Sequence, residues 1–200
     1  AQNPRPTPRI RTRVKASPEL PLPLNICVYC SSSTRVEPAF GEVADEVGMR
    51  LAQAGHTLVY GGGSTGLMGR VARSVHAHGG HVIGVIPESM KSVEVAYLDS
   101  DELIETQTMR ERKHEMDERA DAFLVLPGGF GTLEELSEVI THRYLKFHDK
   151  PIVILNPDGF YDHLLGLFEH FIETGMAKDV YREMYRVTES FKQAMDYLNL

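Results

Sequence analysis

Short apolar runs alternate with amphipathic segments along almost the whole chain. The apolar runs predict strands at 24–30, 56–60, 81–86, 103–106, 122–126, 151–155 and 185–188. Between them, apolar residues recur at helical spacing, and prolines or glycines stand at several of the boundaries. These segments predict helices over 38–54, 66–78, 109–119, 132–145, 160–174 and 190–198.

The predicted strands lack the clean alternation of a sheet that faces water on one side. Runs that are apolar on both faces are typical of a parallel sheet covered by helices. Joins of two to six residues between strand and helix then indicate a doubly wound α/β fold with three layers, helix, sheet and helix. In such a fold ligands bind beyond the carboxyl ends of the strands, so we expect the strand-to-helix loops to carry the function.

The composition supports one globular domain, preceded by a basic N-terminal segment. The chain has 200 residues, of which 42% are hydrophobic and 24% charged, and its net charge is −7. Residues 1–23 hold five basic residues against one acidic residue, which is +4, so the remaining 177 residues carry −11. We expect a disordered, basic, proline-rich arm over 1–23 and a folded domain over 24–200.

Two classes of partner are not expected. The acidic domain does not favour nucleic acid, and the arm alone is weak support for such a partner. No apolar stretch approaches the about 18 residues that cross a bilayer, so no membrane partner is expected either. We therefore expect a cytoplasmic protein.

The two cysteines, Cys27 and Cys30, have the C-x-x-C spacing of redox and zinc sites. A structural zinc site needs four ligands, and no second pair follows. Both cysteines also fall in a predicted strand, where positions three apart point to opposite faces. We expect buried, reduced thiols and no metal site, either here or at His76, His78 and His81, whose side chains should diverge.

A first glycine-rich loop covers residues 60–69. Gly61, Gly63 and Gly66 match the dinucleotide fingerprint G-x-G-x-x-G, and Glu88 stands where a ribose-binding acid would be. The loop also contains G-x-S-x-G around Ser64, the pattern of a serine hydrolase. What the two patterns share is bare backbone N–H groups at a helix N-terminus, which suit an anion. The loop therefore predicts either phosphate contacts, with Gly62 and Gly63 as candidates, or a tight turn without a ligand.

A second glycine-rich loop leads from the strand over 122–126 into the helix over 132–145. Thr132 is a good N-cap, and Glu135, three residues later, would complete a capping box. Alternatively, a carboxylate beside glycines suited to phosphate indicates a site that also stabilises a nearby cation. No Walker A lysine follows either loop, so P-loop chemistry is not expected.

The charged helix over 109–119 places one arginine on its apolar face. Met109, Met116 and Ala120 form the apolar stripe, and Arg112 falls on it. An arginine in that position must extend to solvent or meet a buried anion.

Three motifs together resemble those of the LONELY GUY (LOG) family, cytokinin-activating phosphoribohydrolases that are often mislabelled as lysine decarboxylases. The family pattern P-G-G-x-G-T-x-x-E is intact at 127–135, G-G-G-x-x-G-L-M-G at 61–69, and M-x-x-R-K at 109–113. The resemblance covers roughly residues 24–200. One departure is Ser31, in the segment Cys30-Ser31-Ser32-Ser33, where the family usually has glycine.

The resemblance implies a Rossmann-like fold and a set of site residues. Arg112 and Glu135 match the catalytic pair. The substrate-binding positions implied by the family are Met109, Lys113, Gly128, Gly129, Gly131, Thr132 and Glu134, with Glu94 and Thr141 as further contacts. The implied assembly is a homodimer with its sites near the subunit interface.

The implied reaction is hydrolysis of the N-glycosidic bond of an N6-substituted adenosine 5′-monophosphate to free base and ribose 5-phosphate. A carboxylate such as Glu135 suits the oxocarbenium-like state of that reaction, and no cofactor is needed. Two alternatives remain at this point. One is a non-catalytic carrier of a nucleotide or of the molybdenum cofactor on the same fold, and the other is a serine hydrolase that uses Ser64.

Overall fold

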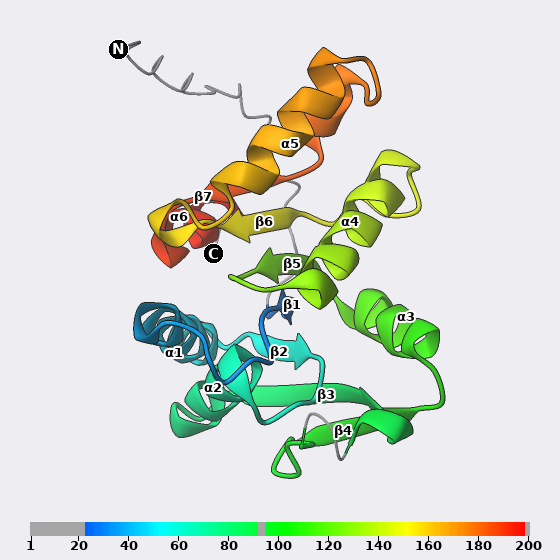
Figure 1. Cartoon of the computed structure of the whole chain (residues 1–200). Coiled ribbons are helices and arrows are strands. Elements are labelled where there is room, and N and C mark those ends of the chain that lie inside the picture. Colours follow the sequence, from blue (N-terminus) through cyan, green and yellow to red (C-terminus); the bar gives the residue numbers. More distant parts are fainter. Residues whose placement is uncertain (1–22, 92–94, 199–200) are drawn as a thin grey trace.

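The computed structural model describes residues 23–91 and 95–198, and these form one seven-stranded sheet in the order β4-β3-β2-β1-β5-β6-β7 (Figure 1). Every pair of neighbouring strands in it is parallel. The strands are β1 Asn25–Tyr29, β2 Thr57–Tyr60, β3 His81–Pro87, β4 Glu102–Thr106, β5 Ala122–Val125, β6 Ile152–Leu155 and β7 Arg186–Thr188. The predicted doubly wound α/β fold is confirmed. The expected arm, except Pro23, lies outside the described residues.

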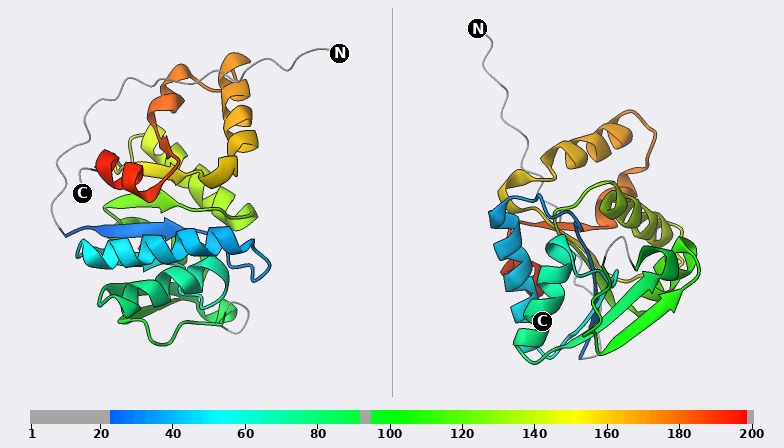
Figure 2. Two further views of the ribbon diagram at one scale, coloured as in Figure 1. Left: turned by 90° about the vertical axis from the view of Figure 1, so that its left-hand side faces the viewer. Right: turned by 60° about the horizontal axis from the view of Figure 1, so that its bottom comes forward.

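Helices cover both faces of the sheet, as the two views of Figure 2 show. The helices are α1 Pro38–Gln53, α2 Gly66–Ala77, α3 Met109–Arg119, α4 Phe130–Tyr144, α5 Asp162–Glu173 and α6 Phe191–Leu198. Apolar residues of α1, α2 and α6 pack on one face, and those of α3, α4 and α5 pack on the other. Short 3-10 helices occur at Glu88–Met90, Pro157–Gly159 and Asp179–Glu183. Among the described residues, no helix has both the length and the hydrophobicity to cross a membrane.

Strand β1 shows how the two cores are built from one run of residues. Ile26 and Val28 point into the core beneath α1 and α2, whereas Cys27 and Tyr29 point into the core beneath α3 and α4. Cys30 joins the first core, so the two cysteines lie on opposite faces. Both are buried thiols that form no disulfide. The interpretation of the C-x-x-C spacing as strand alternation is confirmed.

One local prediction is wrong. Helix α4 begins at Phe130 rather than at 132, and its N-cap is Gly129, which makes no side-chain capping bond. Thr132 therefore lies inside the first turn, and Glu135 lies beyond the position from which it could close a capping box. A side-chain cap does occur at α3, where the backbone N–H of Glu111 donates to the Thr108 hydroxyl at 3.2 Å.

The sheet order places the functional loops side by side. Strand β1 lies in the middle, with β2 on one side and β5 on the other. The connections reverse direction at this point, and that reversal opens a crevice at the carboxyl ends of the strands. The loops after β1, β2 and β5 all reach this crevice.

Candidate active site

A cavity of about 290 Å³ occupies the crevice at the carboxyl ends of β1, β2 and β5. Its walls come from four parts of the chain. These groups of residues are 28–33 at the end of β1 and just after it, Gly61 and Met68 around the first glycine loop, Arg112 and Met116 on α3, and Gly129, Phe130, Gly131, Thr132 and Glu135 at the start of α4. The cavity therefore joins segments from all three motifs of the sequence.

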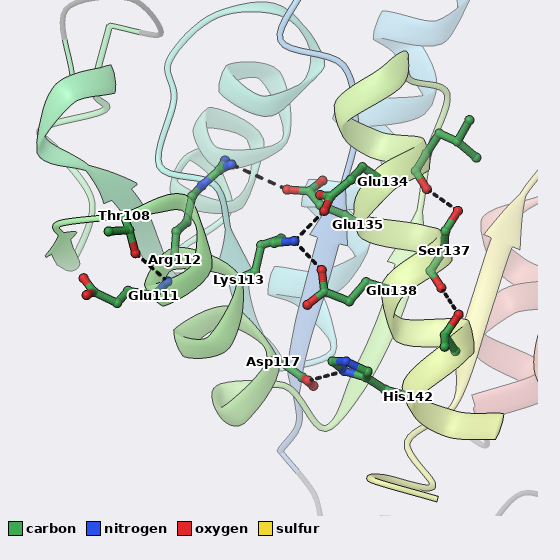
Figure 3. A network of polar contacts seen from close by, with 12 residues as sticks. Thr108, Glu111, Arg112, Lys113, Asp117, Glu134, Glu135, Ser137, Glu138 and His142 are labelled. Carbon is green, nitrogen blue, oxygen red and sulfur yellow. Dashed lines mark hydrogen bonds and ion pairs between the residues drawn. The ribbon is translucent and has the colours of Figure 1, made fainter. Parts of the chain in front are cut away.

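Arg112 and Glu135 meet in the wall of this cavity (Figure 3). Their side chains approach to 3.6 Å between Nη1 and Oε1, and the two residues are only 5% and 9% exposed. Taking two charges out of water costs several kcal/mol unless they are paired and hydrogen-bonded. Glu135 is thus the buried anion that the apolar position of Arg112 predicted.

Two backbone carbonyls complete the surroundings of the Arg112 guanidinium. Nε donates to the carbonyl of Val85 at 3.1 Å, and Nη2 donates to the carbonyl of Gly61 at 3.2 Å. Val85 belongs to β3 and Gly61 directly follows β2. The guanidinium is therefore held between α3 and the ends of two neighbouring strands.

Lys113, the next residue, ties α3 to α4 rather than pointing into the cavity. Its ammonium contacts the carboxylates of Glu134 and Glu138 (Figure 3). Partial burial alone would lower the pKa of Lys113, but the hydrogen bonds to these carboxylates outweigh burial and raise it. Further along the same two helices His142 Nδ1 lies 3.6 Å from Asp117 Oδ2. These contacts hold the catalytic candidates at a fixed separation.

The glycines of the second loop differ in what surrounds them. A side chain at Gly128 would collide with Thr132, because its Cβ would lie 2.1 Å from the Thr132 hydroxyl oxygen. Gly129 and Gly131 have no atom within 4 Å of such a Cβ, and both line the cavity. The N–H groups of the first helical turn lack intrahelical partners, so this open space is suited to an anion.

The loop after β1 supports the second loop in spite of its missing glycine. The N–H of Ser31 donates to the carbonyl of Pro127 at 3.1 Å, and its own carbonyl accepts from Leu67 and Met68 at the start of α2. On the other side, the Tyr161 hydroxyl donates to the carbonyl of Leu126 at 2.7 Å. The serine thus makes backbone contacts that hold the cavity walls together.

Several candidate residues lie away from this cavity. Gly62 and Gly63 are buried but not among its lining residues, and the carbonyl of Gly62 accepts from Tyr97 at 2.8 Å. Thr141 lines a separate, shallow hollow of about 570 Å³ on α4. Met109 is part-exposed at the start of α3. Glu94 lies outside the described residues.

The dinucleotide and serine-hydrolase alternatives gain no support from the first loop. Glu88 is exposed and does not line the cavity. The N–H of Ser64 donates to the carbonyl of Val95 at 2.8 Å, and its carbonyl accepts from Arg73. Within the described ranges no histidine hydrogen-bonds to this serine, which a nucleophilic serine would need.

Several contributors to the site were missed from the sequence. Tyr29 and Met116 line the cavity, and their positions at the end of a strand and on the apolar stripe of α3 could have indicated this. Gly61 also lines it, but spacing could not show which glycine of the triplet faces the cavity. The Val85 carbonyl leaves no signal in sequence, because any residue supplies one.

Relatives of known family match this chain over most of its length. The family described as "Possible lysine decarboxylase" matches residues 68–198. Cytokinin riboside 5′-monophosphate phosphoribohydrolase LOG5 of Arabidopsis thaliana is 40% identical over 173 residues, which is 86% of this chain and 76% of that protein. The LOG2 protein of the same plant is 43% identical, over 80% of this chain and 75% of the relative.

The chain belongs to the LOG family. Solved structures with the same fold include a molybdenum cofactor binding protein from Rippkaea orientalis, with a TM-score of 0.68 and 19% identity over 90% of this chain and 98% of that one. The Moco carrier protein of Chlamydomonas reinhardtii gives a TM-score of 0.65 at 19% identity, over 88% and 95% of the two chains. At this level of identity the likeness shows the Rossmann-like fold alone, so it does not argue for a carrier.

The LOG motifs account for most of the cavity wall. P-G-G-x-G-T-x-x-E supplies the open glycines and Glu135, M-x-x-R-K supplies Arg112, and the first residue of G-G-G-x-x-G-L-M-G supplies the Gly61 carbonyl. The roles assigned to individual residues by the family resemblance stay predictions.

Proposed function

We propose that this LOG-family chain hydrolyses the N-glycosidic bond of N6-substituted adenosine 5′-monophosphates and releases the free base and ribose 5-phosphate. The observation that carries the proposal is the buried Arg112–Glu135 pair in a cavity that is also lined by the first turn of α4. The names of the relatives, which are phosphoribohydrolases of cytokinin riboside 5′-monophosphates, support the same chemistry.

In this proposal the substrate phosphate binds where α4 begins. The backbone N–H groups around Gly129, Gly131 and Thr132 hold it, and the partial positive charge of the helix N-terminus favours it. With the phosphate fixed, the ribose extends toward Glu135, so that binding energy from a remote group orients the bond to be broken.

The chemical step then needs one carboxylate and one water. As the bond from C1′ to the base nitrogen breaks, the sugar develops oxocarbenium character, which the negative charge of Glu135 stabilises. Water adds its oxygen to C1′ and gives one proton to Glu135. Glu135 then returns this proton, through solvent, to the departing base and is a carboxylate again. The pairing with Arg112 orients the Glu135 carboxylate before this step.

The assembly belongs to the same proposal, as a homodimer with its sites near the subunit interface. Phe130 is 92% exposed although it lines the cavity, and Phe147 beyond α4 is also exposed. Large exposed aromatic side chains are common at protein–protein interfaces. Sedimentation analysis should give twice the mass of the chain, and a monomer would rule out this part. The reduced thiols of Cys27 and Cys30 support a cytoplasmic location.

The experiment compares three compounds that differ in one feature each. AMP, isopentenyladenosine monophosphate and isopentenyladenosine are incubated with the protein, and the products are resolved by chromatography. We expect free base and ribose 5-phosphate from a monophosphate, and little or no base from the nucleoside without phosphate. Equal rates with and without the phosphate would overturn the binding mode, and no base from any of them would overturn the hydrolase.

A further inference from the structure

We infer that Gly61 is a positioning residue for the reaction, because its carbonyl and its missing side chain together seat the Arg112 guanidinium against Glu135. This role deepens the proposed function and rests on it. The first glycine loop therefore serves catalysis through Arg112, in addition to any contact with phosphate.

The seat is formed by two carbonyls at the same level of the sheet. Tyr60 and Gly84 are register partners in β2 and β3, so Gly61 and Val85 follow them side by side. Their carbonyls accept from Nη2 and Nε of Arg112 at 3.2 and 3.1 Å. Because a guanidinium is planar, two such bonds fix its plane and leave Nη1 directed at Glu135 Oε1, 3.6 Å away.

The absence of a side chain at position 61 is as important as the carbonyl. A Cβ there would lie 1.9 Å from Arg112 Nη2 and 3.0 Å from Cζ, with Met68 Cε at 2.6 Å on another side. Any side chain would occupy the place of the guanidinium. Both groups are the ends of flexible, buried side chains, and the guanidinium is the nearer one, so the arginine must move furthest.

A methyl group at this position should leave the fold intact. Gly61 does not have a positive φ, unlike Gly62 with φ of 76°, so alanine fits the backbone. The tip of Met68 shifts slightly, and the main damage falls on Arg112, which loses the Gly61 carbonyl and its alignment with Glu135. Misplacing a catalytic group by about 1 Å costs about 100-fold in rate.

The test is a double-mutant cycle on base release from the monophosphate. Gly61→Ala should lower kcat by about 100-fold, with KM changed by less than about threefold and the unfolding temperature nearly unchanged. In an Arg112→Ala background the same change should cost less than about twofold, since the group that it displaces is absent. An active Gly61→Ala, or equal losses in both backgrounds, would overturn the inference.

A spectroscopic measurement decides the point independently of turnover. In the ¹⁵N-labelled protein, the Nε–Hε signal of Arg112 is assigned by its loss in Arg112→Lys. We expect this proton to exchange slowly with solvent in the natural chain and much faster in Gly61→Ala. Unchanged exchange in Gly61→Ala would refute the role of Gly61 in positioning Arg112, even if the chain proved inactive. An inactive natural chain with the expected exchange rates would refute only the proposed function.

Discussion

At the scale of single residues, the Arg112–Glu135 pair is costly in free energy, because two charges are taken out of water. Replacing a buried ion pair by apolar residues of similar size is often neutral or stabilising, so stability alone does not explain such a pair. Here it lines an open cavity beside a helix N-terminus rather than lying within the packed core. The arrangement favours catalysis over structure as the reason for both charges.

Replacing Glu135 with glutamine tests the role of the negative charge. Glutamine keeps the size of the side chain and an oxygen for Arg112, so the chain should still fold. The free energy of unfolding should fall by about 3 kcal/mol, because the buried Arg112 loses its counter-charge. Base release should fall at least about 100-fold, because the charge that stabilises the sugar cation is gone. Steady-state kinetics and thermal unfolding measure the two effects. Glu118→Gln, an exposed change of the same kind on α3, is the control, and near-natural activity in Glu135→Gln would refute the assignment.

The open glycines offer a second test at this scale. Gly131→Ala adds a methyl group into free space inside α4, so stability should stay the same or rise by up to about 1 kcal/mol. The same methyl group stands beside the cavity and should raise KM for the nucleotide about tenfold by holding the phosphate away from the backbone. An unchanged KM would remove this loop from the phosphate site. Gly128→Ala is the comparison, because its collision with Thr132 should lower stability as well.

Sequence reasoning located these residues better than it explained them. The apolar stripe showed that Arg112 must either extend to solvent or meet a buried anion, but it could not identify Glu135 as that anion. For Glu135, the spacing from Thr132 left a capping box as an alternative to a site carboxylate, and only the family resemblance favoured the site. Helix α4 starts two residues earlier than expected, and that small shift removes the box. In the glycine triplet, spacing favoured Gly62 and Gly63, whereas the fold turns the carbonyl of Gly61 toward Arg112.

At the scale of elements, small residues set how closely helices pack. Helices α1 and α2 lie side by side, and Gly48 of α1 is so close to α2 that a Cβ would lie 2.5 Å from the carbonyl oxygen of Val71. Ser74 of α2 donates to the carbonyl of Asp45 at 2.6 Å across the same contact. The position of α2 matters for function because its first residues bond to Ser31 in the cavity wall.

Two glycine-to-alanine changes in helices should therefore have opposite effects. Alanine has the higher helix propensity, and at Gly166 in α5, where a Cβ meets nothing within 4 Å, it should stabilise by about 0.5–1 kcal/mol. At Gly48 the collision with α2 should outweigh that gain and destabilise by about 1–3 kcal/mol. Urea unfolding of the two variants gives both values. Equal effects at the two sites would contradict the close α1–α2 packing.

The order of strands and helices was predictable because the apolar runs of the inner strands β1, β2, β3, β5 and β6 are buried on both faces. The residues at which helices and strands begin and end were harder to predict. The helix expected over 160–174 begins only at Asp162, because Asp158 has a φ of 52° and the chain first forms a 3-10 turn. Such short turns are set by single backbone angles and by contacts such as that of Asn156 with the N–H of Tyr161, which hydrophobic spacing does not report.

At the scale of the whole molecule, the net charge of the domain has the same sign as the charge of the proposed ligand. Residues 24–200 carry −11, the total of −7 less the +4 of residues 1–23, yet the proposed substrate is an anion. Long-range attraction cannot bring it in, and Lys113 is already paired with two carboxylates. Recognition then depends on local groups, chiefly the N–H groups at the start of α4.

The central claim is that this chain is an enzyme and not a carrier on the same fold. The molar ratio of free base released to protein present tests this claim most directly. A known amount of protein is incubated with excess isopentenyladenosine monophosphate, and the free base is measured over time. We predict continued release to well beyond about ten equivalents per chain, as a catalyst requires. Release that stops at or below one equivalent, or bound nucleotide recovered intact, would contradict the account.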